Sequence, residues 1–310
     1  MNKITSRIDN VTNNVGVSTI CPPPISVKIE LSSHCNLKCN FCAHGSIQRM
    51  IHGSMKIGLF DSIIKDLKEF GVKEIGLFYI GESFMCSWLS EAIFICKKKY
   101  GISYTFLTTN GILANENNLK SIFENGLDSL KFSYNSFDEE EFAKVTNCNG
   151  NLIHKLNDNI KLAKRIRDEG EYKCGLYASS IFQPDNPKME PCLDLNVRPY
   201  VDEHYFLPLY NHGGFLKDGR VINGGNTGRL DRPRDPIPCW TLFKEGHITS
   251  DGDISACCFG HAPSFIFGNC REQKFSEVWN NEKYQSIRKL HLSENLNDLK
   301  NSICGSCLLL

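Results

Sequence analysis

The 310-residue sequence has no apolar run that approaches the roughly 20 residues a helix needs to cross a bilayer. Its start, MNKITSRIDNVTNNVGVSTI, is polar and lacks the apolar core of a signal peptide. It has no charge excess, because 35 basic and 35 acidic residues cancel, and no internal repeat or low-complexity tract. We therefore expect a cytoplasmic protein without a net charge that would attract it to nucleic acid or anionic membranes.

Hydrophobic residues make up 41% of the chain and charged residues 23%, which excludes a disordered or fibrous protein and allows one core of roughly 200 residues plus a smaller unit. Fifteen cysteines are many for a reducing compartment, where metal–thiolate chemistry explains them better than disulfides. Three lie close together in LSSHCNLKCNFCAHG and six follow residue 238. The scattered ones are interpreted as small buried hydrophobes: Cys21, Cys86, Cys96, Cys148, Cys174 and Cys192.

Strand-like and helix-like stretches alternate from about residue 25 to 210, as in βα units on a parallel sheet. In the first helical stretch, apolar residues recur at i, i+3, i+4 and i+7 before Gly71. Similar stretches occur at 87–99, 116–124 and 153–168. The pattern predicts an α/β fold with strands at 25–32, 74–80, 103–108, 129–134, 173–179 and 204–209.

Two of the predicted strands have one polar face. A parallel strand in a closed, helix-covered barrel is normally apolar on both faces. The polar faces therefore predict an open barrel whose hydrophilic interior holds a ligand, with edge strands that have one wet face as the alternative. The polar residues are Ser26, Lys28, Glu30 and Ser32 in ISVKIELS, and Ser129, Lys131, Ser133 and Asn135 in SLKFSYN.

Cys35, Cys39 and Cys42 directly follow the first predicted strand, at the edge where α/β barrels collect their active sites. A structural zinc or a closed iron–sulfur cluster takes four protein ligands, so a trio predicts a metal site with one position open. The spacing Cys-x3-Cys-x2-Cys, with Phe41 before the third cysteine, resembles the signature of the radical S-adenosylmethionine (SAM) superfamily. A three-cysteine zinc site with a bound water is the alternative.

The resemblance implies that these three cysteines hold a [4Fe–4S] cluster whose fourth iron binds SAM. It implies reductive cleavage of SAM to methionine and a 5′-deoxyadenosyl radical, with a flavodoxin- or ferredoxin-type reductant as partner. That radical removes hydrogen from a substrate C–H bond. The implied fold is a partial (β/α)6 TIM-like barrel, here a core domain at 25–215 after an N-terminal extension at 1–24.

Other rim segments also resemble the family. YIGES ends the second predicted strand, and Gly81 and Glu82 resemble the glycine–glutamate motif that takes the SAM amino group. Ile80 replaces the usual preceding glycine, and a generic strand-end turn is the alternative. The resemblance implies that Phe41 packs against adenine and that the other cofactor-binding residues are Thr109, Asn110, Ser133, Asn135 and Leu207.

A second cysteine group follows a boundary expected in the loop near 215–235. Cys239, Gly252 and Cys257 are spaced as at the opening of SPASM and Twitch auxiliary-cluster domains, and TSDGDIS predicts a hairpin turn between the two cysteines. The resemblance implies a small C-terminal β-hairpin and helix iron–sulfur domain at 235–310. Its ligands for a second, auxiliary [4Fe–4S] cluster would be Cys239, Cys257, Cys304 and Cys307.

Six cysteines after residue 238 are too few for two fully ligated auxiliary clusters. Because the chain also ends three residues after Cys307, the domain is expected to be of the shorter Twitch type. Cys258 and Cys270 are spare, and each is a candidate ligand, catalytic hydrogen donor or buried side chain. A zinc ribbon is the alternative, although Cys239 and Cys257 lack a tight CxxC knuckle.

The auxiliary cluster, with all four irons held by protein, is expected to transfer electrons. The segment PLYNHGGF offers three side chains that could hydrogen-bond to the hydroxyl groups of a small-molecule substrate: Tyr210, Asn211 and His212. For His212 the alternative is a turn residue that faces solvent. We predict hydrogen abstraction from a carbohydrate- or cyclitol-like molecule, giving oxidation, epimerisation or dehydration. A peptide epimerase or thioether-forming enzyme is the second hypothesis; it is less favoured because the barrel is expected to begin by residue 25, which leaves no room for a separate N-terminal peptide-binding domain. A non-catalytic electron carrier is the third.

Overall fold

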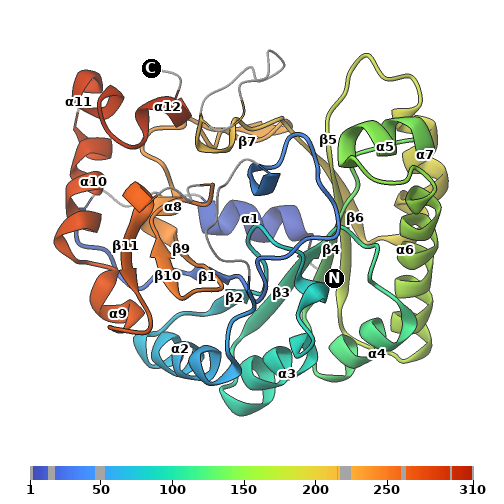
Figure 1. Cartoon of the computed structure of the whole chain (residues 1–310), viewed down its shortest axis with the longest axis horizontal. Helices are drawn as coiled ribbons and strands as arrows, with labels where there is room; N and C mark the ends of the chain where they lie inside the picture. The colour runs from blue at the N-terminus through green and yellow to red at the C-terminus, as the bar shows by residue number, and fades with distance from the viewer. Residues whose placement is uncertain are drawn as a thin grey trace.

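The computed structural model describes residues 3–12, 18–45, 53–214, 216, 225–259, 263–293 and 295–308. Its centre is a nine-stranded sheet in the order β11-β10-β9-β1-β2-β3-β4-β5-β6, which curves around the middle of the molecule (Figure 1). The strands from β1 to β6 are all parallel, which confirms the six predicted βα strands. They are β1 (Ser26–Ile29), β2 (Glu74–Gly76), β3 (Tyr104–Thr109), β4 (Ser129–Ser133), β5 (Gly175–Ile181) and β6 (Glu203–Leu207).

Helices cover the outer face of these strands (Figure 1). In α2 (Ile57–Phe70) the apolar residues at the predicted spacing are buried, and Gly71 at φ 103° ends the helix in the left-handed conformation that glycine tolerates. Helix α5 (Glu139–Thr146) was not predicted from the sequence, although Asp138 caps it by accepting a hydrogen bond from the Glu141 N–H at 2.7 Å. The remaining helices are α3 (Leu89–Phe94), extended by a π-helical turn (Ile95–Lys99), α4 (Glu116–Glu124), α5 (Glu139–Thr146), α6 (Leu152–Glu169) and α7 (Met189–Asn196).

The C-terminal segment continues the same sheet. β9 (Glu245–Ile248) runs parallel to β1, with Glu245 opposite Ser26. The chain then turns at Gly252, whose φ is 86°, into β10 (Asp253–Ser255) and β11 (Ile266–Asn269), both antiparallel to their neighbours. The predicted hairpin is therefore present, and it lies directly beside the first barrel strand.

Short helices pack against this hairpin around an aromatic core. Trp279 is fully buried, stacks on Phe275 and donates a hydrogen bond from Nε1 to the Pro22 carbonyl at 2.8 Å. The expected end of the core domain at 215 and residues 217–224 of the loop after it lie outside the described residues. The helices are α8 (Thr241–Lys244), α9 (Phe275–Val278), α10 (Glu282–Leu292), α11 (Leu296–Lys300) and α12 (Gly305–Leu308).

The N-terminal helix α1 (Ile4–Thr12) covers the amino end of the barrel. Arg7 pairs with Glu74, the first residue of β2, and its guanidinium lies 4.1 Å from the ring centroid of Tyr104, the first residue of β3. The Thr5 hydroxyl donates a hydrogen bond to Glu203, the first residue of β6, at 2.5 Å. Because these contacts all lie where strands begin, α1 closes the end opposite the carboxyl rim. In the described ranges, no helix has both the length and the apolar character needed to span a membrane.

Candidate functional site

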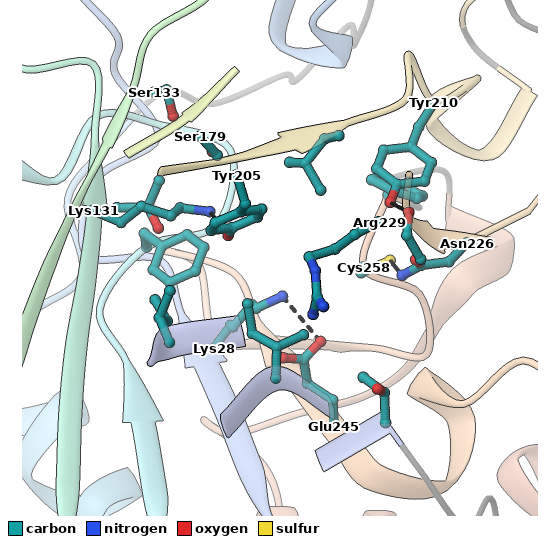
Figure 2. A pocket seen from close by; sticks show the side chains of 18 of the residues that line it. Lys28, Lys131, Ser133, Ser179, Tyr205, Tyr210, Asn226, Arg229, Glu245 and Cys258 are labelled. Atoms are coloured by element: carbon teal, nitrogen blue, oxygen red, sulfur yellow. Dashed lines mark hydrogen bonds and ion pairs between the residues drawn. The ribbon is translucent and has the colours of Figure 1, made fainter. Parts of the chain in front are cut away.

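A cavity of about 380 Å³, hereafter the main cavity, lies inside the barrel. It extends from Glu74 and α1 at the amino ends of the strands to Asn135 and Leu207 at their carboxyl ends. β1 lies between β9 and β2, and β4 lies between β3 and β5, so neither is an edge strand. Polar side chains of these two strands line the cavity as predicted, but most of its lining surface is apolar, so the interior is only partly hydrophilic. The polar side chains are Ser26, Lys28, Ser129, Lys131 and Ser133; Figure 2 labels Lys28, Lys131 and Ser133.

The predicted metal-binding trio lies in the loop after β1. Backbone hydrogen bonds from Lys38 to Thr146 and from Asn40 to Val145 hold this loop against the end of α5. The pKa of Cys39 is raised to about 12, first by burial and then by the charges of Cys42 and Cys35, so the three thiols are close neighbours. Cys42 and Phe41 also line the main cavity. The trio therefore faces the space where a substrate can bind.

The residues around the trio fit a cluster better than a single ion. Three thiolates that raise one another's pKa need a cationic centre to hold them ionised. In the described part of the chain, no three His, Cys, Asp or Glu side chains converge on one metal ion. A four-iron cluster binds each thiolate through a different iron, so it accepts more widely spaced ligands. The three-cysteine zinc alternative receives no support from this arrangement.

Gly81 lies where the second βα loop passes close to the end of β1. Its N–H donates a hydrogen bond to Glu30 Oε1 at 3.1 Å. A Cβ atom at this position would lie 1.9 Å from the Ser32 carbonyl oxygen, so only glycine fits without a backbone shift. Glu30 Oε2 also accepts a hydrogen bond from the Ser250 N–H at 3.1 Å. The glycine, the first strand and the C-terminal hairpin are thus fixed to one another.

Glu82 connects several of the predicted cofactor-binding residues. Its carboxylate accepts hydrogen bonds from the Thr109 hydroxyl and the Asn110 N–H, each at 2.8 Å, and from the Phe84 N–H at 3.1 Å. Burial raises the pKa of Glu82, and these donors oppose the shift. The Asn110 side-chain amide lies 3.9 Å from Cys35 Sγ. The structure therefore joins the glycine–glutamate motif to the cysteine trio, although Glu82, Thr109 and Asn110 do not line the main cavity.

The remaining cofactor-binding candidates line the main cavity directly: Phe41, Ser133, Asn135 and Leu207. Asn135 is fixed at the end of β4, because its Oδ1 accepts a hydrogen bond from the Ile181 N–H at 2.9 Å. These side chains surround the carboxyl end of the barrel on several sides. Their role in binding SAM stays a prediction.

The predicted auxiliary ligands come together as a group. Cys239, Cys257, Cys304 and Cys307 line a second cavity of about 30 Å³ between the hairpin and α12. The pKa of Cys239 is raised to about 11 and that of Cys307 to about 12, first by burial; the Cys258 thiol adds to both shifts, and Cys239 adds to that of Cys307. Four thiols around one small space match the donor set of a closed iron–sulfur cluster.

The candidate catalytic residues lie in different places. Cys258 lines the main cavity, where the Asn226 amide is 3.9 Å from its Sγ (Figure 2). His212 also lines it and packs against Phe259, which favours the site interpretation over a turn that faces only solvent, and burial lowers the pKa of His212 to about 4. Cys270 does not reach the main cavity and lies at another cavity between α2 and α9.

Two other candidates lie at the last strand's rim. The Tyr210 hydroxyl donates a hydrogen bond to the Gly228 carbonyl at 2.6 Å, and its ring lines the main cavity. Asn211 instead donates from its side-chain amide to the carbonyls of Ser306 and Cys307. It therefore supports the segment that carries the auxiliary cysteines, and it is not among the residues that line the main cavity.

Several polar groups of the main cavity were not predicted from the sequence. Lys28 was recognised as polar, but its partner Glu245, 2.9 Å away on β9, had no signal in the sequence (Figure 2). Arg7, Arg229 and Arg234 also line the cavity from segments that were interpreted as an extension and a loop. A fourth cysteine, Cys148, lies close enough to Cys39 to raise its pKa. Only three-dimensional pairing brings these residues to the site.

Comparison with known proteins identifies the family. The sequence pattern of the radical SAM superfamily matches residues 29–172, and that of the SPASM iron–sulfur cluster-binding domain matches residues 239–308. The GTP 3′,8-cyclase of Clostridium perfringens is 31% identical over 250 residues, which cover 75% of this chain and 74% of that protein. The chain belongs to the radical SAM superfamily. It is thus an iron–sulfur enzyme that uses a [4Fe–4S] cluster and SAM, and its SPASM domain implies auxiliary iron–sulfur binding.

Two further relatives resemble this radical SAM enzyme over most of its length. The S-adenosyl-L-methionine-dependent 2-deoxy-scyllo-inosamine dehydrogenase of Niallia circulans is 21% identical over 282 residues, which cover 91% of each chain. SuiB of Streptococcus suis, solved with the precursor peptide SuiA, has a TM-score of 0.67 at 17% identity and is matched over 91% of this chain and 69% of its own. The second likeness shows the fold alone.

Proposed function

We propose that this radical SAM enzyme abstracts a hydrogen atom from a small carbohydrate- or cyclitol-like molecule in the main cavity and oxidises it. One observation carries the proposal: the same cavity is lined by Phe41 and Cys42 of the trio loop and by Cys258, next to the auxiliary ligand candidate Cys257. A volume of about 380 Å³, covered at the amino end by α1, suits a small molecule. The full-length similarity to a cyclitol dehydrogenase supports the same substrate class.

In this proposal the trio of Cys35, Cys39 and Cys42 holds the SAM-binding cluster. When bound, that cluster and SAM supply the 5′-deoxyadenosyl radical, and an auxiliary cluster supplies a one-electron acceptor. A flavodoxin- or ferredoxin-type protein is the proposed reductant. The auxiliary ligands would be Cys239, Cys257, Cys304 and Cys307.

Oxidation of an alcohol removes a hydrogen atom from carbon, a proton from oxygen and one electron. The side chains of the main cavity can bind the substrate hydroxyl from which this proton leaves. Burial would raise the pKa of Glu245, but Lys28 and then His247 outweigh it and lower that pKa to about 2, so Glu245 is ionised and can accept a hydrogen bond from the hydroxyl. Burial lowers the pKa of His212 to about 4, so the neutral imidazole can accept a hydrogen bond as well. Both groups are too weakly basic at neutral pH to keep the proton, which passes on to solvent. Both residues line the cavity.

Product analysis under anaerobic conditions tests this function. The reconstituted full chain would be incubated with SAM, a reductant and a panel of aminocyclitols and sugars in deuterated water. We expect 5′-deoxyadenosine together with a product that has lost two hydrogens and carries no solvent deuterium on carbon. Deuterium at one carbon would instead show epimerisation. With both clusters intact, an absence of 5′-deoxyadenosine for every substrate would contradict the proposal and favour an electron carrier.

Peptide modification is the second candidate. The fold likeness to SuiB motivates it, and so does Cys258, which faces the main cavity as a thioether-forming or hydrogen-donating enzyme requires. Replacing Cys258 with alanine separates the two candidates. A small-molecule dehydrogenase keeps most of its product formation in Cys258→Ala, whereas an epimerase that uses this thiol as hydrogen donor loses its product and still forms 5′-deoxyadenosine.

A further inference from the structure

The cationic side chains of the main cavity differ in how they are neutralised. Most of them have a carboxylate partner within ion-pair distance, which is the usual condition for a charge inside a protein. The paired ones are Arg7 with Glu74, Lys28 with Glu245 at 2.9 Å, and Arg229 with Asp9 at 2.5 Å. These pairs hold the wall of the cavity together and leave little charge for a ligand.

Arg234 is different. Within the described ranges, its Nε and Nη1 are shielded from water and have no hydrogen-bond partner. Cys239 and Asp9 lie close enough to favour its charge, but neither accepts a hydrogen bond from these two nitrogens. The guanidinium lies over the Trp240 ring, 5.1 Å from the centroid, and the residue lines the main cavity. Hydrogen-bond donors of a charged group that are buried without an acceptor cost free energy. An acceptor supplied by a ligand would remove that cost.

The backbone holds Arg234 in this position. Its N–H donates a hydrogen bond to the Thr227 carbonyl at 2.8 Å, which continues the hairpin of β7 (Gly228–Arg229) and β8 (Arg232–Pro233). A Cβ atom on Gly228 would lie 3.1 Å from Nε of Arg234, so glycine leaves room for the guanidinium. The Tyr210 side chain lies next to this hairpin, because its hydroxyl donates a hydrogen bond to the Gly228 carbonyl. The cation is therefore built into the cavity wall.

A second unpaired cation comes from β4. Lys131 has no carboxylate partner in the part of the chain that the structure describes, and its Nζ lies 3.4 Å from the Tyr205 hydroxyl. Figure 2 shows Lys131 of β4 and Tyr205 of β6 at the cavity. Both lie on other strands than Arg229, which belongs to β7. Burial lowers the pKa of Arg234, which an anionic ligand would reverse.

We propose that the substrate carries an anionic group, a carboxylate or a phosphate, and that Arg234 binds it. Lys131 is a further cation, unpaired within the described residues, on the wall of the same cavity. The inference rests on the proposed function in one respect, because it takes the main cavity as the substrate site. Guanidinium donors suit both anions, since each offers several charged oxygens. Within the proposed carbohydrate- or cyclitol-like class, this favours a member that carries such a group, because a neutral member would leave the Arg234 donors unsatisfied.

Anion titration of the reconstituted full chain tests this inference without turnover. Inorganic phosphate and acetate would be titrated separately by calorimetry into the wild type, Arg234→Gln and Arg232→Gln. Arg232 is the matched control, because it lies two residues away, is exposed, pairs with Asp9 and does not line the cavity. We expect saturable binding of one of the anions, weakened about tenfold or more in Arg234→Gln and unchanged in Arg232→Gln.

The outcomes separate the sources of the anion. Preference for phosphate indicates a phosphorylated substrate, and preference for acetate indicates a carboxylic acid. SAM has a carboxylate of its own, so the titration would be repeated with SAM present. Competition between SAM and the anion would overturn the assignment to the substrate, as would the absence of saturable binding or equal binding by Arg234→Gln. Iron content and circular dichroism of Arg234→Gln show whether the variant has folded.

5′-Deoxyadenosine formation gives an independent readout of the proposed function. Anion binding that depends on Arg234 in a chain that never cleaves SAM would refute the proposed function and leave the anion site in place. Cleavage of SAM by a chain that binds neither anion would refute the anion site and leave the proposed function in place.

Discussion

Lys28 Nζ on β1 lies 2.9 Å from Oε2 of Glu245 on β9, inside the main cavity and 217 residues away along the chain (Figure 2). The pair joins the barrel to the C-terminal hairpin at the point where β1 and β9 run side by side. His247 also contacts Glu245, but burial lowers the pKa of His247, so this imidazole is neutral near pH 7. Lys28 is therefore the cation that keeps Glu245 ionised.

Removing Lys28 alone should destabilise the protein. Lys28→Met leaves the Glu245 carboxylate buried without its cation, which typically costs about 3 kcal/mol, whereas Lys28→Met/Glu245→Gln removes both charges and should recover most of the loss. Guanidinium unfolding of the cluster-loaded variants measures the loss in the single variant and the recovery in the double variant. A single variant as stable as the wild type would show that the pair does not hold the hairpin to the barrel.

The same pair predicts a dependence on pH. The lowered pKa of Glu245, about 2, means that its contribution to stability is complete above the unfolded value of about 4.5 and is lost as the pH falls toward 2. The double variant should lack this part of the acid sensitivity. Thermal unfolding of both proteins across that range is the measurement, and parallel curves would contradict the assignment.

His212 should make the protein less stable below neutral pH. Its folded-state pKa is lowered to about 4 by burial, so between that value and about 6.5 the unfolded chain binds a proton that the folded chain does not. Stability therefore falls as the pH drops, by up to about 1.4 kcal/mol per pH unit from this residue. His212→Gln should reduce the slope of unfolding free energy against pH by about one proton. An unchanged slope would mean that His212 is charged in the folded state.

Gly81 offers a test of the SAM motif that leaves the cysteines intact. Gly81→Ala places a methyl group 1.9 Å from the Ser32 carbonyl, so the loop must move, and SAM affinity should fall about tenfold or more. Gly58→Ala is the matched control, because a methyl group there meets no atom within 4 Å and lies inside α2. Equilibrium dialysis with SAM measures the effect. Equal affinity of the two variants would remove Gly81 from the binding site.

Much of the barrel follows from local patterns. The period of two in SVKI and SLKFS placed Lys28 and Lys131 on the inward faces of β1 and β4, because alternate side chains of a strand share one face. The spacing of the trio and of Cys239, Cys257 and the final CGSC likewise identified groups that the fold brings together. These signals lie within one element or one short loop.

The features that were missed depend on long-range pairing. No residue near Glu245 indicates that β9 will lie beside β1, since parallel pairing carries no turn signal between the two strands. The polar segment before residue 25 gave no reason to expect that Arg7 of α1 would bind Glu74 at the amino end of the barrel. Cys258 and Cys270 have similar surroundings in the sequence, yet only Cys258 reaches the main cavity. Tertiary contacts decide which of these residues reach the main cavity.

The auxiliary cysteines should be separable from SAM cleavage. Cys304→Ala removes one of the four thiols around the second cavity and leaves the trio untouched. We expect this variant to keep part of its 5′-deoxyadenosine formation and to lose substrate-derived product. Cys270→Ala, at a different cavity, should keep both activities. Loss of product in Cys270→Ala alone would point to a ligand set that includes Cys270.

The most direct measurement compares Cys39→Ala with Cys148→Ala, since these two cysteines are neighbours and only Cys39 belongs to the trio. Iron content, electron paramagnetic resonance and 5′-deoxyadenosine would be measured on anaerobically reconstituted protein. The account predicts that Cys39→Ala loses the SAM-binding cluster and all cleavage of SAM, while Cys148→Ala keeps both. Undiminished SAM cleavage by Cys39→Ala, or zinc in place of iron at the wild-type trio, would contradict it.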